Sequence, residues 1–554
     1  MKKLLVVLFS TLMVLLMCCA GAEEADEPIV YTSGEWEYVL LEDGTAEIVK
    51  YTEPADPSET ILAIPANLDG YQVSRIGDSF IIPYEIRVGA RLKTIIIPDT
   101  VTSFGTKPFS YCHWLTEICV SADHPNLAAE NGMLYDRNEG RLIWCARSVI
   151  PAAFEVPQGI RIIGSYALSG CAIQTVYIPE SVTTIEEGAF ANCTSLTSID
   201  LPDSVVFIGE KAFIECRSVT SVTLPSNLEC IPDEAFRCLN NLTNIHIPSG
   251  VTTIGANAFS SCTSLATIDI PDGVVTIGPD AFSSCDSLTS VILPSSVTTI
   301  GRSAFYSCRA LTSMDVPDNV TVIDYGTFAN CTSLTSINLP EGITEIGDMA
   351  FGKCKSLSRI TLPGSITSIG EGSFMSCIGL TSLVLPESLT TIGDYAFGGC
   401  SSLTSVTIPD NITHVVANPF SNCDSLTDIR MSDNHPTLSL IDGAMVETAT
   451  GRLIYVPYSQ IGTEYMLPQG ILVVGKDVLG SSDMLTSLII PEGVTTIETK
   501  AFEGCKSLVN VIIPESVTSI GEEAFRRSRK LTFTVVPGSY AEQYCIDNRI
   551  SYTY

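Results

Sequence analysis

The amino-acid sequence predicts a solenoid, in which short coils of one repeated sequence stack into an extended body. The first observation is a proline that returns every 23 residues from Pro179 to Pro409 and resumes the same step from Pro468 to Pro537. The second is a phenylalanine in phase with it, from Phe190 to Phe420 and again at Phe502 and Phe525. The third is an alternation of apolar and polar residues before each proline. A fixed period in the twenties is the sequence signature of a repeat architecture.

One unit shows how each coil is built. Leu265, Ile268 and Ile270 alternate with polar residues, as in a strand with one buried face. Pro271 cannot donate a hydrogen bond and ends the strand, and Phe282 lies in a short helical or 3-10 turn that returns the chain. The L-x-x-L-x-L spacing therefore predicts a leucine-rich-repeat solenoid with a parallel β-sheet on one face and short helical turns opposite. A lone coil buries too little apolar surface to fold, so the coils must stack.

Two longer units interrupt the regular array and match each other. Residues 124–164 align without gaps to residues 435–475, at an offset of 311. Apolar runs on either side of residues 138–140 and of residues 448–451 predict two β-hairpin insertions that stand off the solenoid. The aromatic residues on them are Trp144, Tyr135, Tyr455 and Tyr458. We expect these side chains to cover the base of each hairpin, and a ligand-binding role is the alternative.

The repeat consensus, L-T-S-I-x-L-P-x-x-V-T-x-I-G-x-x-A-F-x-x-C-x-S, resembles the BspA-like leucine-rich-repeat family of bacterial cell-surface proteins. The resemblance extends over essentially all of the chain after the first residues. The segment from Trp36 to Gly77 is similar to the opening cap of that family, and the segment from Val536 to Tyr552 to its closing cap. Caps cover the end coils, which would otherwise expose the core. The resemblance implies attachment to host matrix proteins, host cells or other microbes.

These observations predict eight segments along the chain. They are a signal peptide at 1–22, an N-terminal cap at 23–90, a first regular coil at 91–119, a β-hairpin insertion unit at 120–164, regular 23-residue repeats at 165–429, a second β-hairpin insertion unit at 430–475, repeats at 476–531 and a C-terminal cap at 532–554.

The first residues predict export. Lys2 and Lys3 precede an apolar run, residues 4–17, that is too short to span a bilayer, and residues 20–22 form a small-x-small cleavage site. We expect cleavage near Ala22 and a mature chain that is secreted or held at the cell surface. The alternative is a lipoprotein signal, with a lipid anchor on Cys19. No later stretch is apolar for long enough to cross a membrane, so we expect no membrane insertion of the mature chain.

The charge of the chain narrows the choice of partners. It carries 30 basic and 62 acidic residues, a net charge of −32. Such a field repels phosphate backbones and anionic lipid surfaces, which argues against a nucleic-acid partner. It favours basic or cation-bridged partners. The hydrophobic content of 45% is too high for a disordered chain.

Cysteine recurs in one slot of the repeat, three residues after the repeat phenylalanine or its stand-in. The thirteen members are Cys112, Cys171, Cys193, Cys216, Cys262, Cys285, Cys308, Cys331, Cys354, Cys377, Cys400, Cys423 and Cys505. Stacked neighbours point their Cβ bonds the same way, so we expect a column of buried free thiols, with disulfides as the alternative. Cys230 and Cys238 share one irregular coil and are the pair that could form a local disulfide. No CxxC pair or repeated histidine predicts a metal site.

The sequence contains no recognisable catalytic pattern. None of its five histidines lies in an HExxH motif, and no GxSxG, P-loop or dinucleotide fingerprint occurs, so no catalytic residue, cofactor or metal is predicted. His124 and His435 recur at equivalent places before a proline. We expect a structural role in the turn, with metal binding or acid–base chemistry as the alternative. The acids that follow the strand proline are expected to be solvated, with weak calcium binding as the alternative; they are Asp203, Asp272, Asp318, Glu341, Glu387, Asp410, Glu492 and Glu515.

The candidate binding residues occupy the strand position before the last apolar residue of each coil. They are Tyr177, Asp200, Thr223, His246, Asp269, Ile292, Asp315, Asn338, Thr361 and Val384, and the column continues to Thr407 and Arg430. This position changes from coil to coil, whereas the position two residues earlier is nearly always small and polar. A varied column beside a uniform one predicts a recognition surface for a protein or glycoprotein ligand, with neutral drift on an exposed face as the alternative.

The sequence therefore predicts an exported binding or adhesion protein that is not an enzyme. The alternative is an extracellular, glycan-active enzyme with its site at the hairpin units. That alternative would require two carboxylates that converge in a cleft.

Overall fold

The computed structural model describes residues 28–52, 60–78, 80, 92–110, 112, 114–479, 482–528 and 530–554. The predicted signal peptide and the alternative lipid site at Cys19 lie outside the described residues. The chain divides into two compact units, with the boundary between residues 129 and 130. This boundary falls inside the first predicted hairpin unit.

The first unit combines an antiparallel sheet with the first coils. Strands β1 (Val30–Ser33), β2 (Trp36–Leu40) and β3 (Ala46–Tyr51) form an antiparallel meander, and β3 pairs in parallel with β6 (Tyr71–Ile76). β6 also pairs with β5 (Asn67–Leu68) and β8 (Ser103–Phe104). A second, parallel sheet contains β4 (Ile61–Ala63), β7 (Thr94–Ile96) and β9 (Glu117–Cys119). Thr94 pairs with Glu117, so the 23-residue step of the solenoid is already present here.

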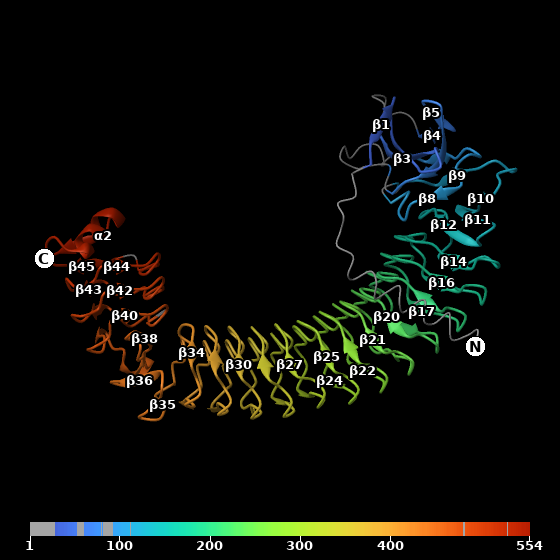
Figure 1. Ribbon diagram of the computed structural model, residues 1–554. Helices are drawn as coiled ribbons and strands as arrows, with labels where there is room; N and C mark the ends of the chain where they lie inside the picture. The colour runs from blue at the N-terminus through green and yellow to red at the C-terminus, as the bar shows by residue number, and fades with distance from the viewer. Residues whose placement is uncertain are drawn as a thin grey trace. The chain divides into compact units, whose positions relative to one another are not determined.

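The second unit is a stack of coils that follow one another in sequence order (Figure 1). Most regular coils have one strand before the repeat proline, here called the long strand, and a second strand of two residues after it, here called the short strand. The long strands are β13 (Ala153–Glu155), β15 (Thr175–Tyr177), β17 (Ser198–Asp200), β19 (Ser221–Thr223), β22 (Thr267–Asp269), β24 (Ser290–Ile292), β26 (Ser313–Asp315), β28 (Ser336–Asn338), β31 (Leu383–Val384), β33 (Ser405–Thr407), β35 (Asp428–Arg430), β39 (Glu464–Met466), β41 (Ser487–Ile489), β43 (Asn510–Ile512) and β45 (Thr532–Thr534).

The short strands form a second set of parallel ladders. They are β14 (Ile162–Ile163), β16 (Thr184–Ile185), β18 (Phe207–Ile208), β20 (Cys230–Ile231), β21 (Thr253–Ile254), β23 (Thr276–Ile277), β25 (Thr299–Ile300), β27 (Val322–Ile323), β29 (Glu345–Ile346), β30 (Ser368–Ile369), β32 (Thr391–Ile392), β34 (His414–Val415), β40 (Val473–Val474), β42 (Thr496–Ile497) and β44 (Ser519–Ile520). The predicted solenoid of 23-residue coils with parallel sheets is confirmed.

The return side of each coil is built from turns rather than from continuous helix. In one coil Cys285 N–H donates to the Phe282 carbonyl, while Phe282 N–H donates to Ala304 in the next coil at 2.8 Å. Asp280 and Ser284 have φ values of 54° and 60°, in the left-handed region. Two left-handed residues in five interrupt a helix and direct alternate N–H groups toward the neighbouring coil. The return side thus adds a third set of hydrogen bonds between coils.

Helix is scarce in the described part of the chain. It consists of one 3-10 turn, η1 (Tyr458–Gln460), and one α-helix, α2 (Tyr540–Asn548). The Ser539 side chain caps α2 by accepting a hydrogen bond from Glu542 N–H at 3.3 Å. Ala541 and Cys545 of α2 are buried against the last coil, and β46 (Ser551–Thr553) pairs with β45. The segment predicted as the C-terminal cap therefore covers apolar side chains at the end of the stack.

The hairpin units are part of the stack and do not stand off it, which corrects the prediction. In the second hairpin unit, β36 (Leu438–Ile441) and β37 (Ala444–Glu447) pair antiparallel, and so do β37 and β38 (Arg452–Tyr455). β38 then pairs in parallel with β40, so the hairpin extends the edge of the short-strand sheet. In the first hairpin unit β10 (Leu127–Glu130), β11 (Met133–Asp136) and β12 (Arg141–Cys145) precede β14 in the same order.

Two of the four aromatic residues predicted to cover the hairpin bases are buried, whereas Tyr135 and Tyr458 are half-buried. Trp144 is 8% exposed and Tyr455 is 1% exposed. The Tyr455 ring meets the edge of Phe420, the last ring of the long phenylalanine column, at a centroid distance of 5.8 Å. Covering the hairpin base is therefore the role of these two side chains.

The core of the second unit is a column of stacked phenylalanine rings. From Phe190 to Phe420, consecutive ring centroids lie 5.1–5.8 Å apart and the ring planes differ by 4–14°. All of these rings are completely buried. Because parallel strands lie about 4.8 Å apart, each ring contacts the equivalent ring of both neighbouring coils. The column links the folding of each coil to that of the next.

The cysteine column lies beside the rings as a row of buried, free thiols. Each of the eighteen described cysteines is free, including the exposed Cys230 and the half-buried Cys238. From Cys193 onward, each member of the column donates its S–H to a backbone carbonyl of the preceding coil, at 3.1–3.3 Å. Burial raises the pKa of the Cys262, Cys331 and Cys377 thiols to about 12.

The apolar core is divided at the second hairpin unit. One cluster of buried side chains runs from Met133 to Tyr455, and another runs from Ala444 to Cys545. The short-strand sheets divide at the same place, since β34 ends one sheet and β36 begins the next. We call the coils before this division the central stack and those after it the C-terminal stack.

We expect Phe305→Ala to destabilise the central stack by about 3–5 kcal/mol, because it removes a buried ring from between Phe282 and Phe328. Denaturant unfolding would measure the loss, and hydrogen exchange would locate it. Tyr306→Ala is the matched control, because Tyr306 is adjacent and 41% exposed. Unchanged hydrogen exchange in the two flanking coils of the Phe305 variant would contradict the coupling of neighbouring coils.

We expect the cysteine column to be unreactive until the protein unfolds. The reactive species is the thiolate, and burial with a raised pKa suppresses it. Folded protein should react with a chromogenic thiol reagent mainly at Cys119, Cys230 and Cys238, which are not buried. After denaturation without a reductant, most of the eighteen cysteines should react. Recovery of only a few thiols would mean that the column is cross-linked in the isolated protein.

Candidate functional site

The ten candidate binding residues form one exposed column on the long strands of the central stack. All ten side chains are exposed, with exposed fractions of 57% for Tyr177, 78% for Ile292 and 77% for Val384. Pairing in register places Asp200 beside Thr223, and Asp269 beside Ile292. Thr361 occupies the equivalent place in a coil whose long strand does not form. We call this set, from Tyr177 to Val384, the recognition column.

Side-chain hydrogen bonds between coils order two acidic members of the recognition column. Thr223 Oγ1 donates to Asp200 Oδ1 at 2.9 Å, and Asn338 Nδ2 donates to Asp315. These bonds fix the directions of the Asp200 and Asp315 side chains. The backbone of His246 forms an isolated parallel bridge with that of Asp269. The apolar members Ile292 and Val384 have no comparable restraint and project into solvent.

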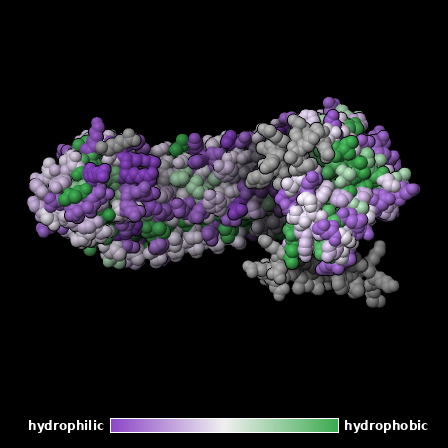
Figure 2. Space-filling model, turned by 90° about the horizontal axis from the view of Figure 1, so that it is seen from above, coloured by the Kyte–Doolittle hydropathy of each residue, from purple (hydrophilic) through white to green (hydrophobic). Residues whose placement is uncertain are grey.

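The same position continues on the C-terminal stack, where the sequence analysis did not select residues. Met466, Ile489 and Ile512 lie in register on β39, β41 and β43. Met466 is 52% exposed and Ile512 is 40% exposed. The repeat period places these residues at the position of Val384, so the same spacing rule would have found them. On the face in Figure 2, hydrophilic residues alternate with small hydrophobic patches.

A second feature is an open cleft where the central stack meets the C-terminal stack. The cleft has a volume of about 470 Å³, and its lining includes Asp394, Arg452, Lys476 and Glu498. Arg452 donates from Nε and Nη2 to the Glu498 carboxylate, each at 2.9 Å. Lys476 Nζ lies 2.9 Å from Asp394 Oδ2. The cleft therefore contains two cations and two anions, and each cation is paired with an anion.

The cleft lies beside a coil that lacks the glycine found in most regular coils. In those coils a glycine follows the short strand, and a Cβ added at Gly278 would lie 2.7 Å from the backbone of the preceding coil. Val416 occupies this position, and its N–H lies 3.5 Å from the Ile392 carbonyl. The equivalent bond from Gly393 to Ile369 measures 2.8 Å. The backbone hydrogen bond to the preceding coil is therefore longer at Val416, although β34 still pairs with β32.

Glutamate replaces the same glycine beside each hairpin unit. Glu498 occupies this position in the coil of β42 and reaches back to Arg452. In the first hairpin unit Glu186 occupies the equivalent position, and Arg141 Nη1 lies 2.6 Å from its carboxylate. Both glutamates also accept a backbone N–H at 3.0 Å, from Lys476 and from Ser165. Both hairpin units thus have an equivalent arginine–glutamate ion pair, which links the hairpin unit to the coils that follow it.

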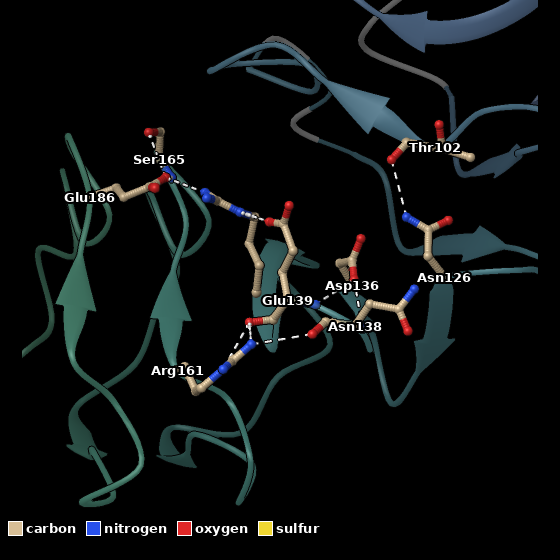
Figure 3. A network of polar contacts seen from close by, with 9 residues as sticks. Thr102, Asn126, Asp136, Asn138, Glu139, Arg161, Ser165 and Glu186 are labelled. Atoms are coloured by element: carbon tan, nitrogen blue, oxygen red, sulfur yellow. Dashed lines mark hydrogen bonds and ion pairs between the residues drawn. The ribbon is translucent and has the colours of Figure 1, made fainter.

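The first hairpin unit adds a further cation to this network. Arg161 donates from Nη2 to the carbonyl oxygens of Glu139, at 2.8 Å, and Asn138, at 3.2 Å (Figure 3). Asp136 accepts from the backbone N–H groups of Asn138 and Glu139, so the hairpin turn is tied from both sides. The second hairpin unit has Leu472 at the position of Arg161 and so does not carry this cation.

A polar contact holds the two stacks together beside the cleft. The Tyr395 hydroxyl donates to the Asp477 carboxylate, and Asn418 Nδ2 donates to the Asp477 backbone carbonyl at 2.9 Å. Lys476 Nζ lies 5.4 Å from the centre of the Tyr395 ring. Burial is the main cause that raises the pKa of Asp477 to about 6, and the neighbouring carboxylate of Glu503 adds to it. Lys500 acts in the opposite direction.

The repeated histidines have a structural role in their turns, as the sequence predicted. His435 Nδ1 accepts from Leu438 N–H at 3.1 Å, and its Nε2 lies 3.1 Å from the Pro409 carbonyl. His124 Nδ1 accepts from Leu127 N–H at 3.1 Å. Among the described residues, no three histidine, cysteine, aspartate or glutamate side chains are grouped in a way that could hold a metal ion. None of the helices in the described ranges is long and apolar enough to span a membrane.

The stacked coils, their parallel ladders and the repeat consensus define a leucine-rich-repeat protein of the solenoid class. The family described as "BspA type leucine rich repeat region" matches residues 83–129, 151–266, 252–380, 367–441 and 463–551. The chain therefore belongs to the BspA-type leucine-rich-repeat family.

Solved structures of bacterial proteins are similar to this chain. A leucine-rich-repeat protein from Bacteroides ovatus is 26% identical, with a TM-score of 0.48, over 72% of this chain and 94% of its own. A leucine rich cell surface protein from Faecalibacterium prausnitzii is 30% identical, with a TM-score of 0.40, over 74% and 96%. The pneumococcal vaccine antigen PcpA is 17% identical, with a TM-score of 0.33, over 95% and 99%. No curated protein matches the chain.

We expect Asp477→Asn to flatten the pH dependence of stability between about pH 4 and 6. The pKa of Asp477 is raised from 3.8 to about 6, so the folded chain holds a proton that the unfolded chain has lost in this window. The stabilisation that comes from the protonated Asp477 side chain is complete below pH 4 and is lost as the pH rises through 6. Melting temperatures at several pH values would measure the slope.

The matched control for this prediction is Asp433→Asn, which makes the same change at an exposed aspartate. It should leave the slope of the wild type unchanged. If the melting temperatures of the Asp477 and Asp433 variants fall with equal slopes as the pH rises, the pH dependence does not come from the Asp477 carboxylate.

Proposed function

We propose that this protein is an exported binding protein, which recognises a protein or glycoprotein outside the cell through the recognition column. The observation that carries the proposal is the exposure of all ten column residues at one position of successive coils, where three pairs of them lie in register on paired strands. A row of varied side chains on successive coils offers many separate contacts to one extended partner. Membership of a bacterial surface-associated family and the predicted signal peptide support a location outside the cell.

The composition of the column indicates the kind of partner. Tyr177, Ile292 and Val384 offer apolar contacts, and exposed aromatic and aliphatic anchors contribute much of the affinity of protein interfaces. Asp200, Asp269 and Asp315 lie between them along the chain and give the surface a negative charge. The net charge of −32 strengthens that field. A partner with a basic surface would therefore associate faster, and the rate would fall with added salt.

An extracellular, glycan-active enzyme is the alternative, and one observation bears on it. Asp394 and Glu498 line the same cleft beside the second hairpin unit. Glycoside hydrolysis needs one protonated acid and one free carboxylate. Both acids here are paired with a cation, which favours binding over hydrolysis. Release of new reducing ends from an oligosaccharide incubated with the protein would favour the enzyme.

We expect a triple variant, Tyr177→Ser, Ile292→Ser and Val384→Ser, to weaken binding by at least about tenfold, because interface anchors contribute more than 1 kcal/mol each. Surface plasmon resonance against a panel of purified extracellular-matrix proteins would provide the partner and the measurement. The exposed positions of the three side chains should leave the melting temperature almost unchanged.

The control carries Val206→Ser and Phe207→Ser, which remove exposed apolar side chains beside and on the short strand β18. It should bind like the wild type. Equal losses of binding affinity in the two variants would show that the ligand does not bind through the recognition column.

A further inference from the structure

We propose that the cleft between the central and C-terminal stacks is a binding site for a neutral sugar residue of a glycan. This site is separate from the recognition column, because it is lined by the short strands β42 and β44 and by the hairpin strand β38. Its volume of about 470 Å³ lies in the usual range of small-molecule sites, ~300–1,000 Å³.

The paired charges in the cleft favour a ligand without a net charge. Arg452 is paired with Glu498 by three contacts of 2.9–3.1 Å, and Lys476 is paired with Asp394 at 2.9 Å. An anionic ligand would have to compete with two carboxylates, and a cationic ligand with an arginine and a lysine. The Arg452 and Asp394 side chains are only 16% and 11% exposed, so the paired arrangement is largely preformed. Preformed, paired charges can offer hydrogen bonds without attracting an ion.

Hydrogen-bonding groups of both kinds remain in the cleft. Arg452 uses Nε and Nη2 for Glu498, which leaves Nη1 available to donate. Lys476 has two further N–H groups besides the one directed at Asp394. Thr499 and Ser519 are exposed in the lining, and each hydroxyl can donate and accept. A sugar hydroxyl also donates and accepts, so it can satisfy both kinds of group at once.

The cleft also has an apolar wall. Val416, Ala417 and Ile497 contribute to the lining, but only Val416 is exposed, at 44%, because Ala417 and Ile497 are buried. The C–H face of a sugar ring is apolar and can cover the exposed Val416 side chain, which removes it from water. Paired charges, hydroxyls and a small apolar wall together match a neutral pyranose better than an ion or a peptide.

Isothermal titration calorimetry with neutral di- to tetrasaccharides of glucose, galactose, mannose and N-acetylhexosamines would test the proposal, with sialylated and sulfated oligosaccharides as charged comparators. We expect at least one neutral oligosaccharide to bind the full chain. The double variant Thr499→Val and Ser519→Ala removes two hydroxyls at nearly constant volume. It should weaken that binding at least about fivefold, because each lost hydrogen bond lowers affinity several-fold.

Two controls separate this site from the rest of the molecule. Arg452→Lys should weaken sugar binding, whereas Arg141→Lys, the same change in the first hairpin unit, should not. The triple variant of the recognition column should bind the sugar normally, so the two proposals fail independently. Absence of binding by every neutral oligosaccharide, binding of charged ones alone, or binding that survives the Thr499 and Ser519 changes would each overturn the proposal.

Discussion

The close contact between equivalent atoms of successive coils is the constraint on which the rest of the structure depends. Each coil must present the same shape to the coil before it and the coil after it, at the spacing of a parallel β-ladder. The stacked phenylalanine rings, 5.1–5.8 Å apart, occupy the interior at that spacing. The thiol column and the glycine after each short strand obey the same rule, since a Cβ at Gly278 would collide with the preceding backbone. Variation is therefore confined to positions that face solvent or lie where the stack is interrupted.

This constraint explains why the two candidate sites differ in kind. The recognition column is a surface of the regular stack, where side chains vary freely because they touch only solvent and their neighbours along the sheet. The cleft is a fault in the stack. It lies where Val416 occupies the usual glycine position and where the hairpin unit begins a new sheet. Polar residues that would be excluded from the core, such as Asp477 and Arg452, lie at this boundary between the two stacks.

The hairpin units have a clearer structural purpose than the sequence indicated. Each begins a sheet with an antiparallel strand pair, and an arginine–glutamate pair binds it to the coils that follow. The antiparallel hairpin thus covers a sheet edge that would otherwise be open. In the second hairpin unit the arginine–glutamate pair lies in a cleft with other paired charges. The proposed sugar site is based on these accessible polar groups at the boundary between the two stacks.

The coil, its period, its buried face and the position of the recognition column could all be predicted from the amino-acid sequence. These features follow from a 23-residue repeat, because a strict period places every equivalent residue in one row whatever the details of the fold. The breaks in the glycine position were also visible in the sequence, but their meaning was not; they are Glu186, Pro232, Asp324, Val416 and Glu498. The packing of the folded chain was needed to show that the hairpins extend the sheets and that Asp394 meets Lys476, 82 residues later. Such contacts depend on how an interrupted stack resumes, and this is set by packing between coils rather than by the repeat within one.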